Sequence, residues 1–166
     1  FEDNVSPANV YGITKLCGEI SIKNYPSTIL RTNFFGLSQS PVRVSFSDWI
    51  LQSLIAQKQL NLFKDVLFSP VHISSLCKVI KMAIDLRPYG TYNVGCSGGI
   101  SKAQFGLELA NRLGFSPKRI KLRSISGVSL KARRPLDMRM STIKFENCFG
   151  ISSPSMNTEI QKAVLE

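Results

Sequence analysis

A tyrosine and a lysine four residues apart are the residues of this sequence whose types and spacing first suggest chemistry. Tyr11 and Lys15 stand in the segment Tyr-Gly-Ile-Thr-Lys, and in an α-helix they would lie one turn apart on the same side. An ammonium close to a phenol stabilises the phenolate, which helps the phenol give its proton to a carbonyl oxygen. The spacing alone is a weak signal, because an aromatic residue beside a solvated lysine has the same pattern.

The pair needs a helix to hold it, and the flanking residues predict one. Ser6 followed by Pro7 is typical of a helix start, since a hydroxyl caps the first turn and proline fits the first helical position. The side of this helix opposite the pair is apolar, and we expect it to anchor the helix. It consists of Val10, Ile13, Leu16, Cys17 and Ile20.

Helix-like and strand-like segments alternate downstream, which is typical of an α/β fold. A β-prone run at 28–35 ends before Gly36, and ligands of α/β sheets bind beyond the carboxyl ends of the strands. Asn33, Phe34 and Phe35 are therefore candidate binding residues, although Phe35 could equally close the core. We expect helices over about 47–58, 74–86, 101–113, 141–149 and from 154 onward, with caps at Ser47 and Asp48, at Ser74 and Ser75, and at Ser101, and strands at 60–63, 89–95 and 120–123.

The segment around the pair, residues 7–19, resembles the active-site helix of the extended short-chain dehydrogenases/reductases. Within that superfamily it is most similar to the dTDP-4-dehydrorhamnose reductase group. Further segments extend the resemblance in collinear order over nearly the whole chain, so it is far more specific than any single motif. They are Leu-Arg-Thr-Asn-Phe-Phe-Gly at 30–36, residues 65–70, Gly-Thr-Tyr-Asn-Val-Gly at 90–95, and Ala-Arg-Arg-Pro at 132–135.

The resemblance implies an NAD(P)H-dependent oxidoreductase that reduces the 4-keto group of a nucleotide-activated 6-deoxy sugar, in dTDP-L-rhamnose biosynthesis. Tyr11 would protonate the keto oxygen, and Lys15 would hold the ribose of the nicotinamide nucleotide, which is NADPH or NADH. Tyr11, Lys15, Asn33 and Phe34 would contact the cofactor, and Phe34 would also contact the sugar. Arg134 would bind the substrate diphosphate, because a guanidinium forks onto phosphate oxygens and related enzymes carry an arginine in a comparable late position.

Two other functions stay open. Another sugar-nucleotide epimerase or dehydratase of the same superfamily would use the same tyrosine and lysine with additional acid/base residues. A non-catalytic regulatory subunit, of the kind that partners methionine adenosyltransferase, shares the fold and need not reduce a sugar. The presence of both Tyr11 and Lys15 favours the enzyme.

The expected fold is α/β, the C-terminal part of a Rossmann-like NAD(P)-binding fold plus a smaller substrate-binding portion. Residues 1–36 would end the Rossmann-like part, and 37–166 would mix its remaining elements with the substrate-binding part. The glycine-rich turn that seats a dinucleotide is not found in the sequence, and the family's catalytic serine or threonine would also precede Phe1. We therefore expect the C-terminal portion of a longer reductase, inactive by itself.

Composition narrows the partners. Of the 166 residues, 43% are hydrophobic and 19% charged, which is typical of a soluble globular protein, and no apolar run approaches the ~20 residues that span a bilayer. The net charge of +10 attracts anions, yet no run matches a nucleic-acid-binding motif. We expect a nucleotide-sugar substrate, no nucleic-acid or membrane partner, and a cytoplasmic location, and the resemblance allows a homodimer.

The dispersed cysteines do not suggest a metal site. Cys17, Cys77, Cys96 and Cys148 form no Cys-x-x-Cys pair, and the sequence has a single histidine, His72. We expect reduced, mostly buried cysteines that act as small hydrophobic residues, and a histidine that is satisfied within a strand.

Overall fold

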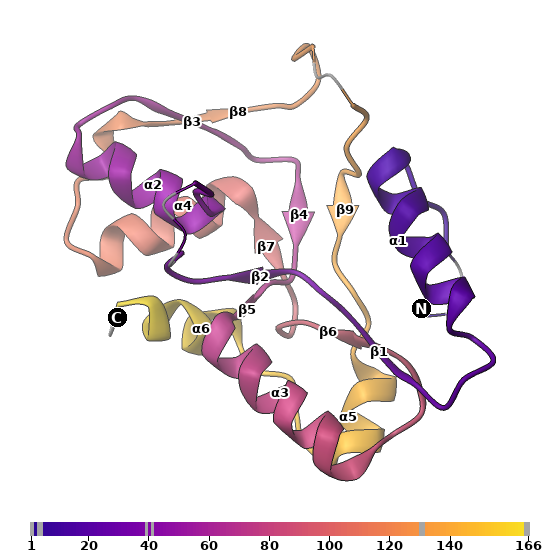
Figure 1. Ribbon diagram of the computed structural model, residues 1–166. Coiled ribbons are helices and arrows are strands. Elements are labelled where there is room, and N and C mark those ends of the chain that lie inside the picture. The colour runs from indigo at the N-terminus through magenta and orange to yellow at the C-terminus, as the bar shows by residue number, and fades with distance from the viewer. Residues whose placement is uncertain (1, 3–4, 39, 41, 130–131, 165–166) are drawn as a thin grey trace.

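The computed structural model describes residues 2, 5–38, 40, 42–129 and 132–164 and has the expected α/β architecture (Figure 1). Helices and strands alternate along most of the chain. The helices are α1 (Val10–Ser21), α2 (Phe46–Ile55), α3 (Ile73–Leu86), α4 (Lys102–Arg112), the 3-10 helix η1 (Pro117–Arg119), α5 (Ile143–Phe149) and α6 (Met156–Ala163). The strands are β1 (Thr28–Thr32), β2 (Phe34–Phe35), β3 (Leu60–Phe63), β4 (Leu67–Phe68), β5 (Val71–His72), β6 (Gly90–Val94), β7 (Ile100–Ser101), β8 (Ile120–Arg123) and β9 (Asp137–Met138).

Most strand pairs are parallel, as expected where helices form the connections. β1 pairs with β6, β2 with β5 and β3 with β8, whereas β4 lies between antiparallel β7 and parallel β9. The predicted single strand at 28–35 is divided into β1 and β2, because the chain changes partner at Asn33. The Asn33 carbonyl accepts a hydrogen bond from Val71 N at 2.9 Å, between the two pairings.

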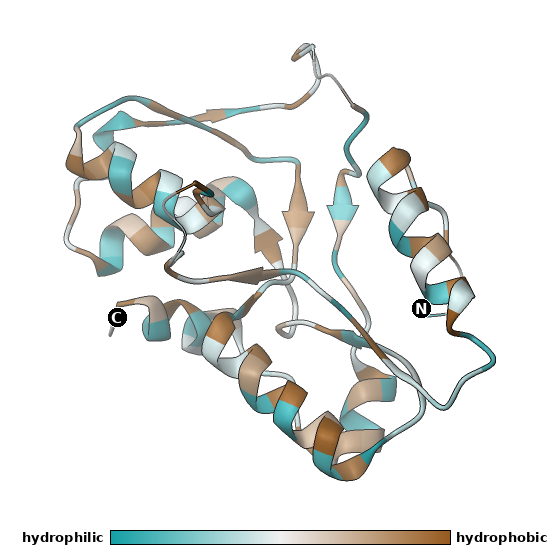
Figure 2. Ribbon diagram, viewed as in Figure 1, coloured by the Kyte–Doolittle hydropathy of each residue, from teal (hydrophilic) through white to brown (hydrophobic). Residues whose placement is uncertain are grey.

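Two hydrophobic clusters hold these elements together. One gathers around β3 with α2, α4 and α6, and its central residues Ile50, Leu60 and Phe105 have no exposed surface. The other joins β5 and β6 to α3 and α5, where Tyr92 and Phe149 meet edge to face with ring centroids 5.4 Å apart. Figure 2 shows β4 and β7 as hydrophobic and β9 as more hydrophilic.

Helix α1 begins later than the sequence predicts. Asn9, with extended backbone, is its N-cap, and the Asn9 Oδ1 accepts a hydrogen bond from Gly12 N at 2.9 Å. The Ser6 cap is therefore wrong, because Asn9 stands closer to the apolar run and its amide oxygen reaches the first turn. The apolar side of α1 is not an anchor either: no residue of the helix is buried, and Val10 is 75% exposed.

The other helix starts follow capping chemistry, with small shifts. Ser45, not Ser47 or Asp48, is the N-cap of α2, although Asp48 completes its capping box. His72 caps α3 in place of Ser74 or Ser75, since its Nδ1 accepts from Ser74 N at 3.3 Å. The predicted capping box of Ser101 and Gln104 on α4 is confirmed.

Buried polar groups join the C-terminal helix to the sheet. Glu159 has no exposed surface; it accepts hydrogen bonds from His72 N at 2.5 Å and Ser75 Oγ at 2.9 Å and pairs with Lys162. Of the cysteines only Cys96 is buried, so the expectation of mostly buried cysteines is wrong: α1 and α3 turn Cys17 and Cys77 to the surface. No helix in the described ranges combines the length and apolar character needed to cross a membrane.

Candidate functional site

A cavity of about 1030 Å³ lies where α1, the β1–β2 junction, β3, the start of α4 and the loop at 132–135 meet. This volume is at the upper end of the range for pockets that hold drug-sized ligands, about 300–1,000 Å³. Tyr11, Asn33 and Arg134 all line it. Three residues that the sequence nominated from distant segments therefore share one cavity.

Tyr11 is placed at the mouth of this cavity by the first turn of α1. Its side chain is 71% exposed, and the Lys15 ammonium lies 5.3 Å from the centroid of its ring. The Tyr11 phenol and the Lys15 ammonium thus lie close together, as the sequence predicts. Gly12 lets the preceding segment fold back on the helix, because a Cβ at this position would lie 2.9 Å from the Pro7 Cβ.

The remaining nominated residues differ in their positions. The side-chain amide of Asn33 donates to the Met138 carbonyl at 3.5 Å, which joins the β1–β2 junction to β9 beside the cavity. Phe34 is 60% exposed and is not among the described residues that line the cavity, whereas Phe35 is buried in the hydrophobic core. Lys15 is beside Tyr11 but does not line the cavity.

Asn9 is a positioning residue that the sequence analysis missed. Besides capping α1, its Nδ2 donates to the Arg133 carbonyl at 2.9 Å, across 124 positions of sequence. One side chain thus ties the turn that carries Tyr11 to the loop that carries Arg134. Its position just before the first turn was the available signal, since asparagine is a preferred N-cap.

The walls of the cavity carry positive charge. Lys102, Arg133 and Arg134 line it, and no aspartate or glutamate occurs among the described lining residues. Burial, together with the nearby charge of Arg134, lowers the pKa of Lys102 to about 8. Such a surface attracts an anionic ligand and disfavours a cationic one.

Aromatic side chains form part of the same wall. Phe46 and Trp49 of α2 stack with ring centroids 6.0 Å apart, and both line the cavity together with Phe63. Flat apolar surfaces of this kind suit a planar ring or the carbon face of a sugar. A wall that is both cationic and aromatic suits a nucleotide, which has anionic phosphates and a planar base.

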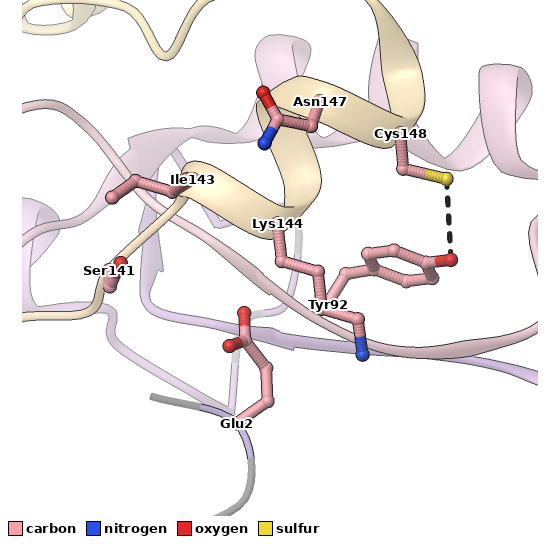
Figure 3. A pocket seen from close by; sticks show the side chains of 7 residues that line it. All are labelled: Glu2, Tyr92, Ser141, Ile143, Lys144, Asn147 and Cys148. Atoms are coloured by element: carbon pink, nitrogen blue, oxygen red, sulfur yellow. Dashed lines mark hydrogen bonds between the residues drawn. The ribbon is translucent and has the colours of Figure 1, made fainter.

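A second cavity, of about 500 Å³, lies between β6 and α5 (Figure 3). There the Cys148 Sγ donates to the Tyr92 Oη at 3.3 Å, and the Lys144 ammonium lies 5.1 Å from the Tyr92 ring centroid. Burial, with the contact to Cys148, raises the pKa of Tyr92 to about 12. This makes Tyr92 a poor proton donor near neutral pH. Within the described ranges, no group of three or more His, Cys, Asp or Glu side chains could hold a metal ion.

Comparison with known proteins gives a match over the whole chain. The family model described as the RmlD substrate binding domain matches residues 1–166. The dTDP-4-dehydrorhamnose reductase of Sinorhizobium fredii is 28% identical over 98% of the chain and 58% of its own length. The probable low-salt glycan biosynthesis reductase Agl14 of Haloferax volcanii is 23% identical over 95% of the chain and 54% of its own length.

Solved structures agree with the fold. The dTDP-4-dehydrorhamnose reductase of Yersinia enterocolitica matches with a TM-score of 0.85 and 27% identity, over 98% of this chain and 58% of that one. The reductase of Bacillus anthracis, solved with NADP, has a TM-score of 0.87 at 21% identity over 98% of this chain and 57% of its own, a likeness of fold alone. The chain thus spans somewhat more than half the length of the relatives that it matches.

Proposed function

Because this chain belongs to the family of RmlD substrate-binding domains, we propose that it forms the substrate-binding part of an NAD(P)H-dependent reductase. The substrate would be a nucleotide-activated 6-deoxy sugar with a keto group at C4, of the dTDP-4-dehydrorhamnose type. The observation that carries this proposal is the cavity that joins Tyr11 to a cationic wall with Lys102 and Arg134. A phenol at one side and positive charge at another match a keto sugar linked to a diphosphate.

In the proposed arrangement the diphosphate lies against Arg134, whose guanidinium can donate two parallel hydrogen bonds to phosphate oxygens. The sugar then extends toward Tyr11, which gives its proton to the keto oxygen as the C4 carbon is reduced. The Lys15 ammonium, 5.3 Å from the ring centroid, stabilises the phenolate that remains. The family's reduced nicotinamide supplies a hydride when bound.

The exposed side chains of Tyr11, Lys15 and Phe34 fit the nicotinamide end of such a cofactor, since they present a hydroxyl, an ammonium and an aromatic ring to solvent. We propose that they hold it together with Asn33. The division of the chain into an end of the Rossmann-like part, 1–36, and a mixed remainder, 37–166, is also part of this proposal. The two hydrophobic clusters support the mixed character of residues 37–166, because one of them draws its residues from β5, β6, α3 and α5 and the other mainly from β3, α2, α4 and α6.

The test is oxidation of NADPH or NADH by the complete protein that contains this chain, with a dTDP-4-keto-6-deoxy sugar as substrate. Loss of a general acid typically costs about 10²–10⁴-fold in rate, and we expect Tyr11→Phe to reduce kcat by that factor. Tyr25→Phe is the matched control, since Tyr25 is 70% exposed and is not among the described residues that line the cavity. It should leave kcat unchanged.

Two outcomes would overturn the proposal. Unchanged turnover in Tyr11→Phe would remove the phenol from the reaction. Binding of the sugar nucleotide without any turnover by the wild-type protein would instead favour a regulatory subunit with a retained binding cavity.

A further inference from the structure

Lys102 lies at a position of α4 where a positive charge does not stabilise the helix. It is the first residue of α4, directly after the N-cap Ser101, and its backbone N–H donates to the Val66 carbonyl at 2.9 Å. The N-terminal end of a helix carries a partial positive charge, so a cation there is unfavourable. A lysine at this point breaks a local rule, and such breaks concentrate at functional sites.

The contacts of the Lys102 side chain leave its charge uncompensated. Its Nζ lies 3.6 Å from the ring centroid of Phe68 and 4.3 Å from that of Phe46. Aromatic faces attract a cation but do not neutralise it. Within the described part of the chain the ammonium has no hydrogen bond and no ion pair, and the charge that acts on it is that of Arg134, which repels it.

We propose that the Lys102 ammonium binds the diphosphate of the nucleotide sugar together with Arg134, so that the two cations clamp it from two walls of the cavity. This inference rests on the proposed function and assigns a second diphosphate contact on α4. An anion between the two cations would remove their mutual repulsion and restore a counter-charge to the partly desolvated ammonium. Binding is therefore favoured by relief of an unfavourable state of the empty cavity.

The same geometry predicts a linkage between binding and protonation. In the empty cavity the pKa of Lys102 is about 8, so the ammonium loses its proton as the pH rises through that value. A bound anion raises this pKa, so binding above pH 8 takes up a proton. Among the described lining residues, the other titratable groups are Tyr11, Arg133 and Arg134, and the two arginines stay protonated throughout.

A diphosphate could come from the nucleotide sugar or from the dinucleotide cofactor, and calorimetry separates the two. Binding of dTDP-glucose and of NADPH to the complete protein is measured at pH 8.5 in two buffers of different ionisation enthalpy. The wild-type protein should take up a proton with dTDP-glucose.

Lys102→Met keeps an apolar side chain on Phe46 and Phe68 but removes the charge. Because the variant also loses a hydrogen bond to a charged group, its affinity for dTDP-glucose should fall about tenfold to a hundredfold. Proton uptake should disappear, and NADPH affinity should not change.

Two further variants distinguish charge from structure. Lys102→Arg should retain the affinity but lose the proton uptake, because arginine does not titrate in this range. Lys144→Met is the matched control: Lys144 also lies over an aromatic ring, that of Tyr92, but in the separate cavity of Figure 3. It should change neither affinity nor proton uptake.

Each contrary result has its own meaning. If Lys102→Met binds dTDP-glucose as tightly as the wild-type protein while Arg134→Ala binds it more weakly, the inference fails and the proposed function stands. If Lys102→Met weakens NADPH in place of dTDP-glucose, the diphosphate belongs to the cofactor and the inference is overturned. If the wild-type protein binds no dTDP-glucose at all, the proposed function itself fails.

Discussion

Replacement of Asn9 tests how the cavity is assembled, because one side chain makes two separate contacts. The Oδ1 caps α1 through Gly12 N, and the Nδ2 donates to the Arg133 carbonyl, both at 2.9 Å. Asn9→Ala removes both contacts. Asn9→Asp keeps an equally good cap and removes only the donor to the loop at 132–135.

The magnitude follows from these contacts. Loss of the cap costs about 1 kcal/mol, and loss of the exposed amide–carbonyl hydrogen bond costs about 0.5 kcal/mol. No residue of α1 is buried, so the helix should open locally without unfolding of the rest. A total of about 1.5 kcal/mol corresponds to about a tenfold rise in the opening equilibrium, whereas Asn9→Asp should give about a twofold rise.

Amide hydrogen exchange is the appropriate assay, since it reports the opening of one helix. In Asn9→Ala the amides of α1 should exchange about tenfold faster, and those of the buried α4 should keep their protection. Ser6→Ala is the control, because Ser6 is the cap that sequence reasoning selects and the structure does not. Equal loss of protection in Ser6→Ala and Asn9→Ala would refute the cap assignment, and full protection in Asn9→Ala would refute both contacts.

Two further perturbations test the scaffold around the cavity. A Cβ on Gly95 would lie 2.7 Å from the Ser69 carbonyl oxygen, and such overpacking costs about 1–3 kcal/mol. Gly95→Ala should therefore lower the free energy of unfolding, measured in urea, by that amount. Gly18→Ala is the control and should not lower it, because the space around a Cβ at Gly18 is open. Hydrogen bonds from the Ser124 hydroxyl and the Ile125 N–H hold the pKa of Asp65 below its usual value. This carboxylate therefore stabilises the fold fully at pH values above its unfolded-state pKa, which is near 4. The stabilisation is lost as the pH falls through the lower, folded-state pKa. Asp65→Asn should therefore flatten the acid side of the stability–pH curve, and an unchanged slope would contradict the linkage.

Much of the local structure could be predicted from the sequence. The alternation of helices and strands, the capping box at Ser101 and the placement of Tyr11 and Lys15 on one helix all depend on residues within one or two turns of each other. Interactions of such short range are encoded in neighbouring residues, so pattern and spacing suffice to find them. The collinear motifs likewise indicate the family from the sequence alone.

Tertiary structure decided the features that depend on contacts distant in sequence. The break of the 28–35 run at Asn33 follows from two different partner strands, and the tie from Asn9 to Arg133 spans 124 positions. The charge state of Lys102 depends on two aromatic rings and on Arg134, none of which adjoins it in sequence. Desolvation and charge repulsion depend on distances in space, so only the folded chain could show that the lysine after the N-cap of α4 faces the cavity as an uncompensated cation.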